Sequence, residues 1–110
     1  MSRLDSLLGF LREDPNDTFT LFAIASEFRK LGDDEQALAY FNRLAEHHPD
    51  YVGTYYHLGK LLESLHRAEE AIAVYTRGIR KAEELRDFHA RAELQDALMR
   101  ARGVDFDDNP

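Results

Sequence analysis

Apolar residues recur along the chain at steps of three and four positions, a spacing that places them on one face of an α-helix. Two successive sets show this most clearly: Leu21, Ile24, Ala25 and Phe28, followed by Ala37, Leu38, Phe41, Leu44 and Ala45. Gly32 and two aspartates separate these sets. Glycine favours the end of one helix, and acidic residues favour the start of the next. The pattern therefore predicts a pair of helices joined by a short turn.

The segment from Pro15 to Arg43 matches the segment from Pro49 to Arg77 at one constant shift, without a gap. Several positions are identical in the two segments: Pro15/Pro49, Thr20/Thr54, Leu31/Leu65, Glu35/Glu69, Ala37/Ala71, Ala39/Ala73 and Arg43/Arg77. Proline cannot continue a preceding helix, so the two prolines fall between helical pairs. The repeat therefore predicts two consecutive helical hairpins with the same internal arrangement.

This repeat resembles the tetratricopeptide repeat (TPR) family, whose unit has the same length and sets small and large residues at fixed points of two antiparallel helices. The second unit keeps the family's large residue and Leu-Gly pair in Tyr55, Leu58 and Gly59. Two departures are Leu62 in place of an aromatic residue and Glu83 in place of a third proline. The resemblance implies an all-α fold of about six helices, in which antiparallel helix hairpins form a right-handed superhelical array.

We expect a single domain over residues 1–103. Its parts are an N-terminal half-repeat helix over 2–13, repeats over 18–51 and 52–85, and a C-terminal capping helix over 87–102. Because no proline interrupts it, the last helix of the second repeat is predicted to continue to Leu85, where Arg86 and Asp87 offer a break and an N-cap. Residues 104–110 form a polar tail that we expect to be disordered.

Composition narrows the classes of function. The chain has 110 residues, a formal net charge of −7 and no cysteine. The lack of cysteine excludes disulfides, thiol nucleophiles and cysteine-bound metals, and makes the cytoplasm the expected location. The negative charge opposes binding to phosphate backbones and anionic lipids, and the N-terminal apolar run is too short for a membrane span. We therefore expect neither a nucleic-acid nor a membrane partner.

Catalytic motifs are absent from the sequence. It contains no glycine-rich phosphate loop, no Gly-x-Ser-x-Gly elbow and no His-Glu-x-x-His motif. Its five histidines include no pair at the i, i+4 spacing that holds a metal ion on one helix. We therefore expect a protein that is not an enzyme and that has no cofactor and no metal site.

In TPR proteins, the helix faces turned away from the packing stripe line a concave groove. By position, the resemblance assigns to this groove Phe19, Phe22, Ser26 and Arg29 in the first repeat, Tyr56, Lys60 and Glu63 in the second, and His89 in the final helix. Aromatic residues and arginine are frequent in binding hot spots. Phe22 and Tyr56 suit packing against a neighbouring helix equally well, so both interpretations stay open.

The function expected from these features is non-enzymatic binding of a partner protein or peptide in the groove. Basic residues beside the aromatic positions favour a ligand with apolar and acidic side chains or a C-terminal carboxylate. Chaperone-binding members hold a terminal carboxylate with lysine, asparagine and arginine, but Phe22, Ser26 and His57 occupy the first three of those places here. The alternative is a structural module that associates with itself through its terminal helices and could form a homodimer.

Overall fold

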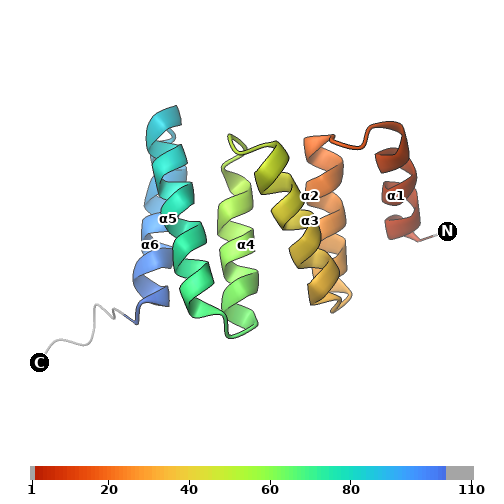
Figure 1. Cartoon of the computed structure of the whole chain (residues 1–110). Coiled ribbons are helices and arrows are strands. Elements are labelled where there is room, and N and C mark those ends of the chain that lie inside the picture. Colours follow the sequence, from red (N-terminus) through yellow and green to blue (C-terminus); the bar gives the residue numbers. More distant parts are fainter. Residues whose placement is uncertain (1, 104–110) are drawn as a thin grey trace, which may run out of the picture. The chain divides into compact units, whose positions relative to one another are not determined.

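The computed structural model describes residues 2–103, and within this range the chain forms six helices and no strand (Figure 1). The helices are α1 (Arg3–Glu13), α2 (Thr18–Lys30), α3 (Asp34–His47), α4 (Gly53–Ser64), α5 (Ala68–Leu85) and α6 (Phe88–Ala101). The prediction of an all-α chain with about six helices is confirmed. The polar tail that we expected to be disordered, residues 104–110, lies outside the described residues.

Short polar side chains fix where several of the helices begin. The backbone N–H of Asp5 donates to Ser2 Oγ at 3.1 Å, and the backbone N–H of Thr20 donates to Asp17 Oδ2 at 2.9 Å. Asp33 and Asp87 cap α3 and α6 in the same way. Each such cap satisfies a backbone donor that the helix itself leaves unpaired, and stabilises the helix by about 1 kcal/mol.

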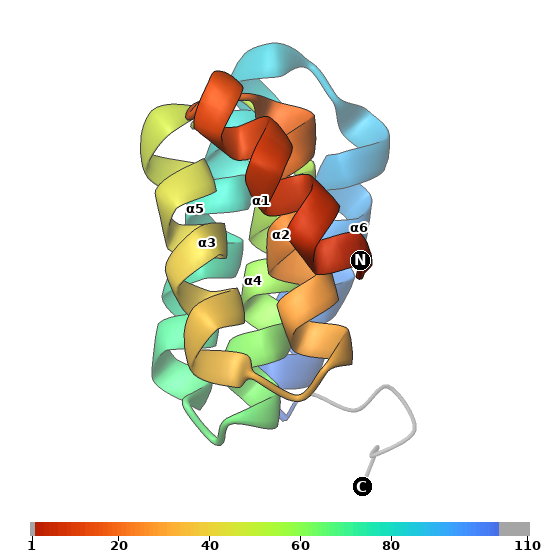
Figure 2. The same cartoon turned by 90° about the vertical axis from the view of Figure 1, so that its right-hand side faces the viewer.

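The chain divides into two compact units, Met1–Thr54 and Tyr55–Pro110. In the first unit, α2 packs against both α1 and α3, and α1 runs obliquely to α2 (Figure 2). The core of this unit joins the three helices through buried apolar residues: Leu7 and Leu11 of α1, Leu21, Ala23 and Ile24 of α2, and Leu44 of α3. The helical stripe predicted from the apolar spacing is therefore the stripe that the first unit buries.

In the second unit, α5 packs against α6. The ring of Tyr75, on α5, is completely buried. The close approach of α4 depends on Gly59, since a Cβ atom there would lie only 2.1 Å from Cε1 of Tyr75. Gly78 makes a second close approach, because a Cβ atom at that position would lie 2.6 Å from Cβ of Tyr55. Two glycines thus make room for two large buried rings.

The junction between α5 and α6 agrees with the sequence prediction. Helix α5 continues to Leu85, and Arg86 then adopts a left-handed backbone conformation with φ of 58°. The backbone N–H of Asp87 donates to Ala82 O at 2.8 Å, and its side chain caps α6. A left-handed residue after the last turn is a common way to end a helix, although arginine takes this conformation less readily than glycine.

Candidate functional site

The four candidate residues of the first unit lie on one face of α2. Phe19, Phe22, Ser26 and Arg29 follow one another at steps of three and four, so they fall within one side of the helix. Phe19 is 73% exposed in the first turn, and its ring adds a large apolar group to the surface. The face therefore begins with an exposed aromatic side chain and ends with a basic one.

The start of this face is held by Asp17, whose carboxylate accepts from the hydroxyl of Thr20 at 2.7 Å and from its backbone N–H at 2.9 Å. The hydroxyl hydrogen bond is the main reason that the pKa of Asp17 is lowered from its ordinary value, and the backbone hydrogen bond adds to it. Asp17 thus fixes the first turn of α2, the turn that carries Phe19.

Phe22 is half-buried between two other aromatic rings. Its ring centroid lies 5.9 Å from that of Phe41 and 5.8 Å from that of Tyr51, with edge-to-face angles of 75° and 87°. These are favourable geometries for aromatic pairs. The packing interpretation of Phe22 is therefore supported, and one edge of the cluster is formed by Tyr51, which was not among the residues predicted for the site.

Tyr51 extends the aromatic surface beyond α2. Its side chain is 40% exposed, and it borders a hollow of about 430 Å³ lined by Thr18, His47, His48, Pro49 and Asp50. The carbonyl of Asn16 accepts a hydrogen bond from the ring of His48, which ties this turn to the one before α2. An aromatic residue two positions after the inter-repeat proline was the signal that could have identified Tyr51.

Arg29 supplies positive charge near the end of the α2 face. It is partly exposed in the last turn, next to the exposed Lys30. Within residues 2–103, neither side chain forms an ion pair with an acidic residue. Nearby, Glu27 pairs instead with Arg3 of α1 at 3.5 Å. The two cations are therefore available to an acidic group from outside the chain.

The candidate residues of α4 lie in the second unit and form a contiguous chain of contacts. Lys60 Nζ lies 5.7 Å from the ring centroid of Tyr56 and 3.8 Å from Glu63 Oε2. The hydroxyl of the buried Tyr75 donates to the same Glu63 oxygen at 2.5 Å. Lys60 thus already has an acidic partner in Glu63, so this face is less basic than Lys60 alone suggested.

His89 is the candidate that the structure leaves apart. Its side chain is 90% exposed on α6, and its Nε2 lies 3.4 Å from Glu93 Oε2. Among the described residues, no hydrogen bond, ion pair or ring contact joins His89 to Tyr56, Lys60 or Glu63. The structure therefore brings together the α4 candidates but gives His89 no part in their contacts.

Clusters of metal-binding side chains and membrane-length apolar helices are both absent from the part of the chain that the structure describes. No three His, Cys, Asp or Glu side chains in residues 2–103 are grouped so that they could hold a metal ion. None of the described helices has both the length and the apolar character to cross a bilayer.

Known protein families match both halves of the repeat pattern. Residues 20–51 and residues 52–84 each match a family model described as tetratricopeptide repeat. No curated protein matches the chain.

Solved structures give the same family. The chain is 46% identical to a tetratricopeptide repeat domain protein from Salinibacter ruber solved by NMR, with a TM-score of 0.79 over 88% of this chain and 98% of that one. A crystal structure of a tetratricopeptide repeat domain protein from the same organism is 48% identical, with a TM-score of 0.74 over 81% of this chain and 99% of that one. The TPR2B domain of yeast Sti1, in complex with pHsp70, shares the fold at 17% identity, with a TM-score of 0.83 over 93% of this chain and 82% of that one.

Proposed function

Because the chain belongs to the tetratricopeptide repeat family, we propose that it is a non-enzymatic protein–protein interaction module that binds a segment of a partner protein. The proposed contacts are the candidate residues of the first helices: Phe19, Phe22, Ser26 and Arg29 on α2, and Tyr56, Lys60 and Glu63 on α4. His89 is proposed only as a peripheral contact. The expected location in the cytoplasm stays a prediction.

The observation that carries the proposal is the combination of exposed aromatic surface and available positive charge on α2. Phe19 is 73% exposed, and Arg29 has no acidic partner within residues 2–103. The two residues are ten positions apart, which is about 15 Å along a helix. An extended peptide rises about 3.3 Å per residue, so it covers this distance in four or five residues.

The preferred ligand of the α2 face is therefore an extended segment with an apolar side chain and an acidic group, four to five residues apart. The apolar side chain would pack on Phe19 and the exposed edge of the Phe22–Tyr51 pair. The acidic group, either a side chain or a terminal carboxylate, would accept charge-assisted hydrogen bonds from Arg29. Phe22 would contribute mainly as a fixed support, because its own ring already packs against Phe41.

The α4 face supports binding of a different kind. Lys60 already forms an ion pair with Glu63, so a carboxylate of the ligand would have to compete with Glu63 for Lys60. The ring of Tyr56 is partly exposed and lies against Lys60. We therefore propose that α4 contributes aromatic contact area and that α2 contributes the charge preference.

A chaperone tail is not the proposed ligand. The yeast Sti1 domain is solved with pHsp70, but that similarity concerns the fold alone. The family's lysine, asparagine and arginine set for a terminal carboxylate is not present, since Phe22, Ser26 and His57 stand at its first three places. The alternative of self-association rests on a separate surface, the exposed Phe10 of α1.

A displayed library of random peptides tests the ligand preference, and it does not require that the partner be identified first. We expect the selected peptides to share an apolar residue and an acidic residue four to five positions apart. Phe19→Ala should weaken the best peptide about tenfold, in the range of a hot-spot residue. Arg29→Glu should reverse the charge preference towards basic peptides.

Arg80→Glu is the matched control for this reversal. Arg80 is also an exposed arginine, but it lies on α5, which carries none of the proposed contacts. This control should select the same peptides as the unaltered chain. Peptides that bind equally well to the Phe19→Ala, Arg29→Glu and unaltered chains would show that the ligand uses another surface.

A further inference from the structure

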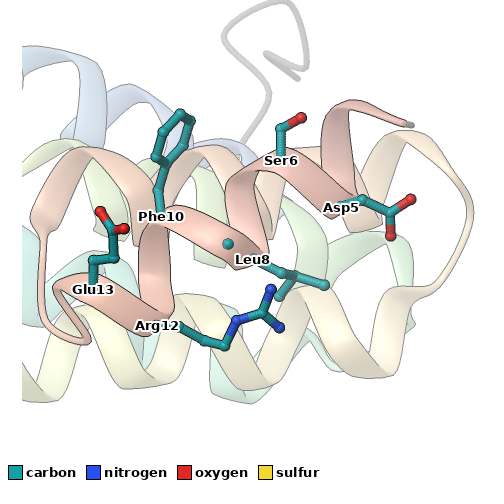
Figure 3. A pocket seen from close by; sticks show the side chains of 7 residues that line it. Asp5, Ser6, Leu8, Phe10, Arg12 and Glu13 are labelled. Atoms are coloured by element: carbon teal, nitrogen blue, oxygen red, sulfur yellow. The ribbon is translucent and has the colours of Figure 1, made fainter.

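The outward face of α1 carries an exposed aromatic residue that the binding function does not use. Phe10 is 59% exposed and borders a hollow of about 710 Å³, together with Asp5, Ser6, Gly9, Arg12 and Glu13. Figure 3 shows Phe10 and Ser6 projecting from the same side of α1. On the side of α1 turned away from Gly9, Leu7 and Leu11 are buried in the core of the first unit. The helix therefore has a second, partly apolar face without a covering element in the described residues.

The repeat register identifies what kind of element fits this face. At the shift that superposes Pro15 on Pro49, Phe10 falls on Leu44 and Leu44 falls on Gly78. Leu44 is fully buried in a core that it shares with Leu21 and Ile24 of α2, the first helix of its own hairpin. Gly78 lies against Tyr55 of α4, again the first helix of its hairpin. By this register, the equivalent place on α1 corresponds to one that an antiparallel helix covers in the other two hairpins.

We propose that this place is occupied by α1 of a second copy of the chain, in an antiparallel pair related by a twofold axis. The charges of the face are self-complementary in that arrangement. Asp5 and Arg12 lie on the same side of α1, seven residues or two turns apart. In an antiparallel pair, each Asp5 faces Arg12 of the other copy, so one symmetric interface contains two ion pairs.

The same register brings the two aromatic rings together. When Asp5 is opposite Arg12 of the second copy, the midpoint of the pair falls between positions 8 and 9. The two Phe10 residues are then offset by three positions, about 4.5 Å along the helix axis, which is within reach for an aromatic pair. Gly9 permits close approach because it has no side chain. Apart from its chain neighbours and the backbone of α1, only Arg12 Nη2, at 3.8 Å, lies near the place that its Cβ would take, among the described residues.

The area of such an interface sets the expected affinity. An eleven-residue helix face is smaller than the surface buried in a standard stable complex. The dimer should therefore dissociate on dilution, with a Kd on the order of 10–100 µM. This self-association is independent of peptide binding, because it uses α1 and none of the residues proposed to bind a ligand.

Sedimentation velocity from about 1 µM to 1 mM tests the dimer. The unaltered chain should shift from monomer to dimer, and Phe10→Ser should remain monomeric. Phe88→Ser is the matched control, because Phe88 is 57% exposed on α6, the other terminal helix, and should leave the dimer unchanged. Peptide binding should survive in both variants. A chain that stays monomeric throughout, or a dimer lost on Phe88→Ser instead of Phe10→Ser, would overturn the proposal.

Charge exchange tests the antiparallel register. Arg12→Asp alone and Asp5→Lys alone each place like charges opposite one another, so each should raise the Kd about tenfold. A mixture of the two variants should restore dimerisation, because the heterodimer contains two complementary pairs. Failure of the mixture to associate more tightly than either variant alone would contradict this register.

Asp5 also accepts a hydrogen bond from the backbone N–H of Ser2 in the cap of α1, so a cross-linking test avoids changing it. The natural chain has no cysteine, and a single Gly9→Cys substitution places one thiol near the proposed axis. We expect mild oxidation to give a disulfide-linked dimer, whereas Ala39→Cys on the exposed side of α3 should give little. Equal cross-linking of the two variants would refute the pairing of α1 with itself.

Discussion

The contact between Gly59 and Tyr75 allows a sharp prediction about the core of the second unit. A Cβ atom at position 59 would lie 2.1 Å from Cε1 and 2.5 Å from Cζ of Tyr75. Carbon atoms in contact normally lie about 3.5–4.0 Å apart. The ring would therefore have to move away by more than 1 Å, which is about the difference between the two sets of distances. Tyr75 is fully buried, so its retreat would displace other core side chains.

Two effects of opposite sign determine the outcome of Gly59→Ala. Replacing a glycine inside a helix with alanine gains about 1 kcal/mol in helix propensity. Overpacking a well-filled core costs about 1–3 kcal/mol, and the overlap here places the cost at the upper end. We expect a net loss of about 2 kcal/mol in the free energy of unfolding, which corresponds to a fall of roughly 10 °C in Tm for a chain of this size.

Urea denaturation followed by circular dichroism measures this loss, and Gly9→Ala is the matched control. Gly9 also lies inside a helix, but apart from its chain neighbours and the backbone of its own helix, its added Cβ would meet only Arg12 Nη2, at 3.8 Å, among the described residues. At a few micromolar protein, where the proposed dimer is dissociated, this control should stabilise the chain by up to about 1 kcal/mol. A lower free energy of unfolding for Gly59→Ala together with a higher one for Gly9→Ala would support the packing argument. If Gly59→Ala were as stable as the unaltered chain, the reasoning would be refuted.

Three further substitutions test other parts of the structure. Asp17→Asn keeps a capping oxygen but cannot ionise. Since the pKa of Asp17 is lowered from 3.8, the stabilisation by its carboxylate is present above that value and is lost as the pH falls through the folded-state pKa. Urea titrations below about pH 5 should therefore show that the variant loses less stability with falling pH than the unaltered chain does. Tyr75→Phe removes the hydrogen bond to Glu63 and should lower the free energy of unfolding, measured by urea denaturation, by about 1 kcal/mol. An unchanged free energy of unfolding would mean that water satisfies Glu63 as well as the hydroxyl does. Leu11→Ala should lower the free energy of unfolding by about 2–3 kcal/mol because Leu11 is in the core, and a change below about 0.5 kcal/mol would show that α1 is not anchored there.

The fold could be predicted because its main determinants are local and repeated. Helical spacing of apolar residues and N-capping residues such as Asp17 and Asp87 act within a few positions of the chain. The constant shift between the two repeats then supplies the same pattern twice. Even the break at Arg86 was predictable, because Asp87 is a good capping residue directly before a new helical stripe.

Whether an individual site residue is buried, exposed or paired depends on contacts that its spacing in the sequence does not reveal. Phe22 and Phe19 are close neighbours on one face of α2, but Phe22 is half-buried and Phe19 is largely exposed. The difference arises because Phe41 and Tyr51 pack on Phe22. Similarly, Lys60 forms an ion pair with Glu63, and the Glu63 carboxylate also accepts a hydrogen bond from the hydroxyl of Tyr75, twelve residues away. A residue's place in the repeat predicts its helix face but not its partners.

The repeat register itself explains why fold and specificity differ in how well they can be predicted. Packing restricts the core positions, so equivalent residues keep their character there, as Ala25 and Gly59 remain small and buried. The equivalent surface positions are not restricted in this way. Arg29 corresponds to Glu63, and Phe19 corresponds to Gly53, so at these two positions the charge changes sign and the aromatic ring is lost between one repeat and the next. A ligand that matches the α2 face therefore does not match the α4 face. Under the proposed binding function, the two first helices would therefore contact different parts of a partner, and exchanging Arg29 and Glu63 should alter ligand preference far more than it alters the fold.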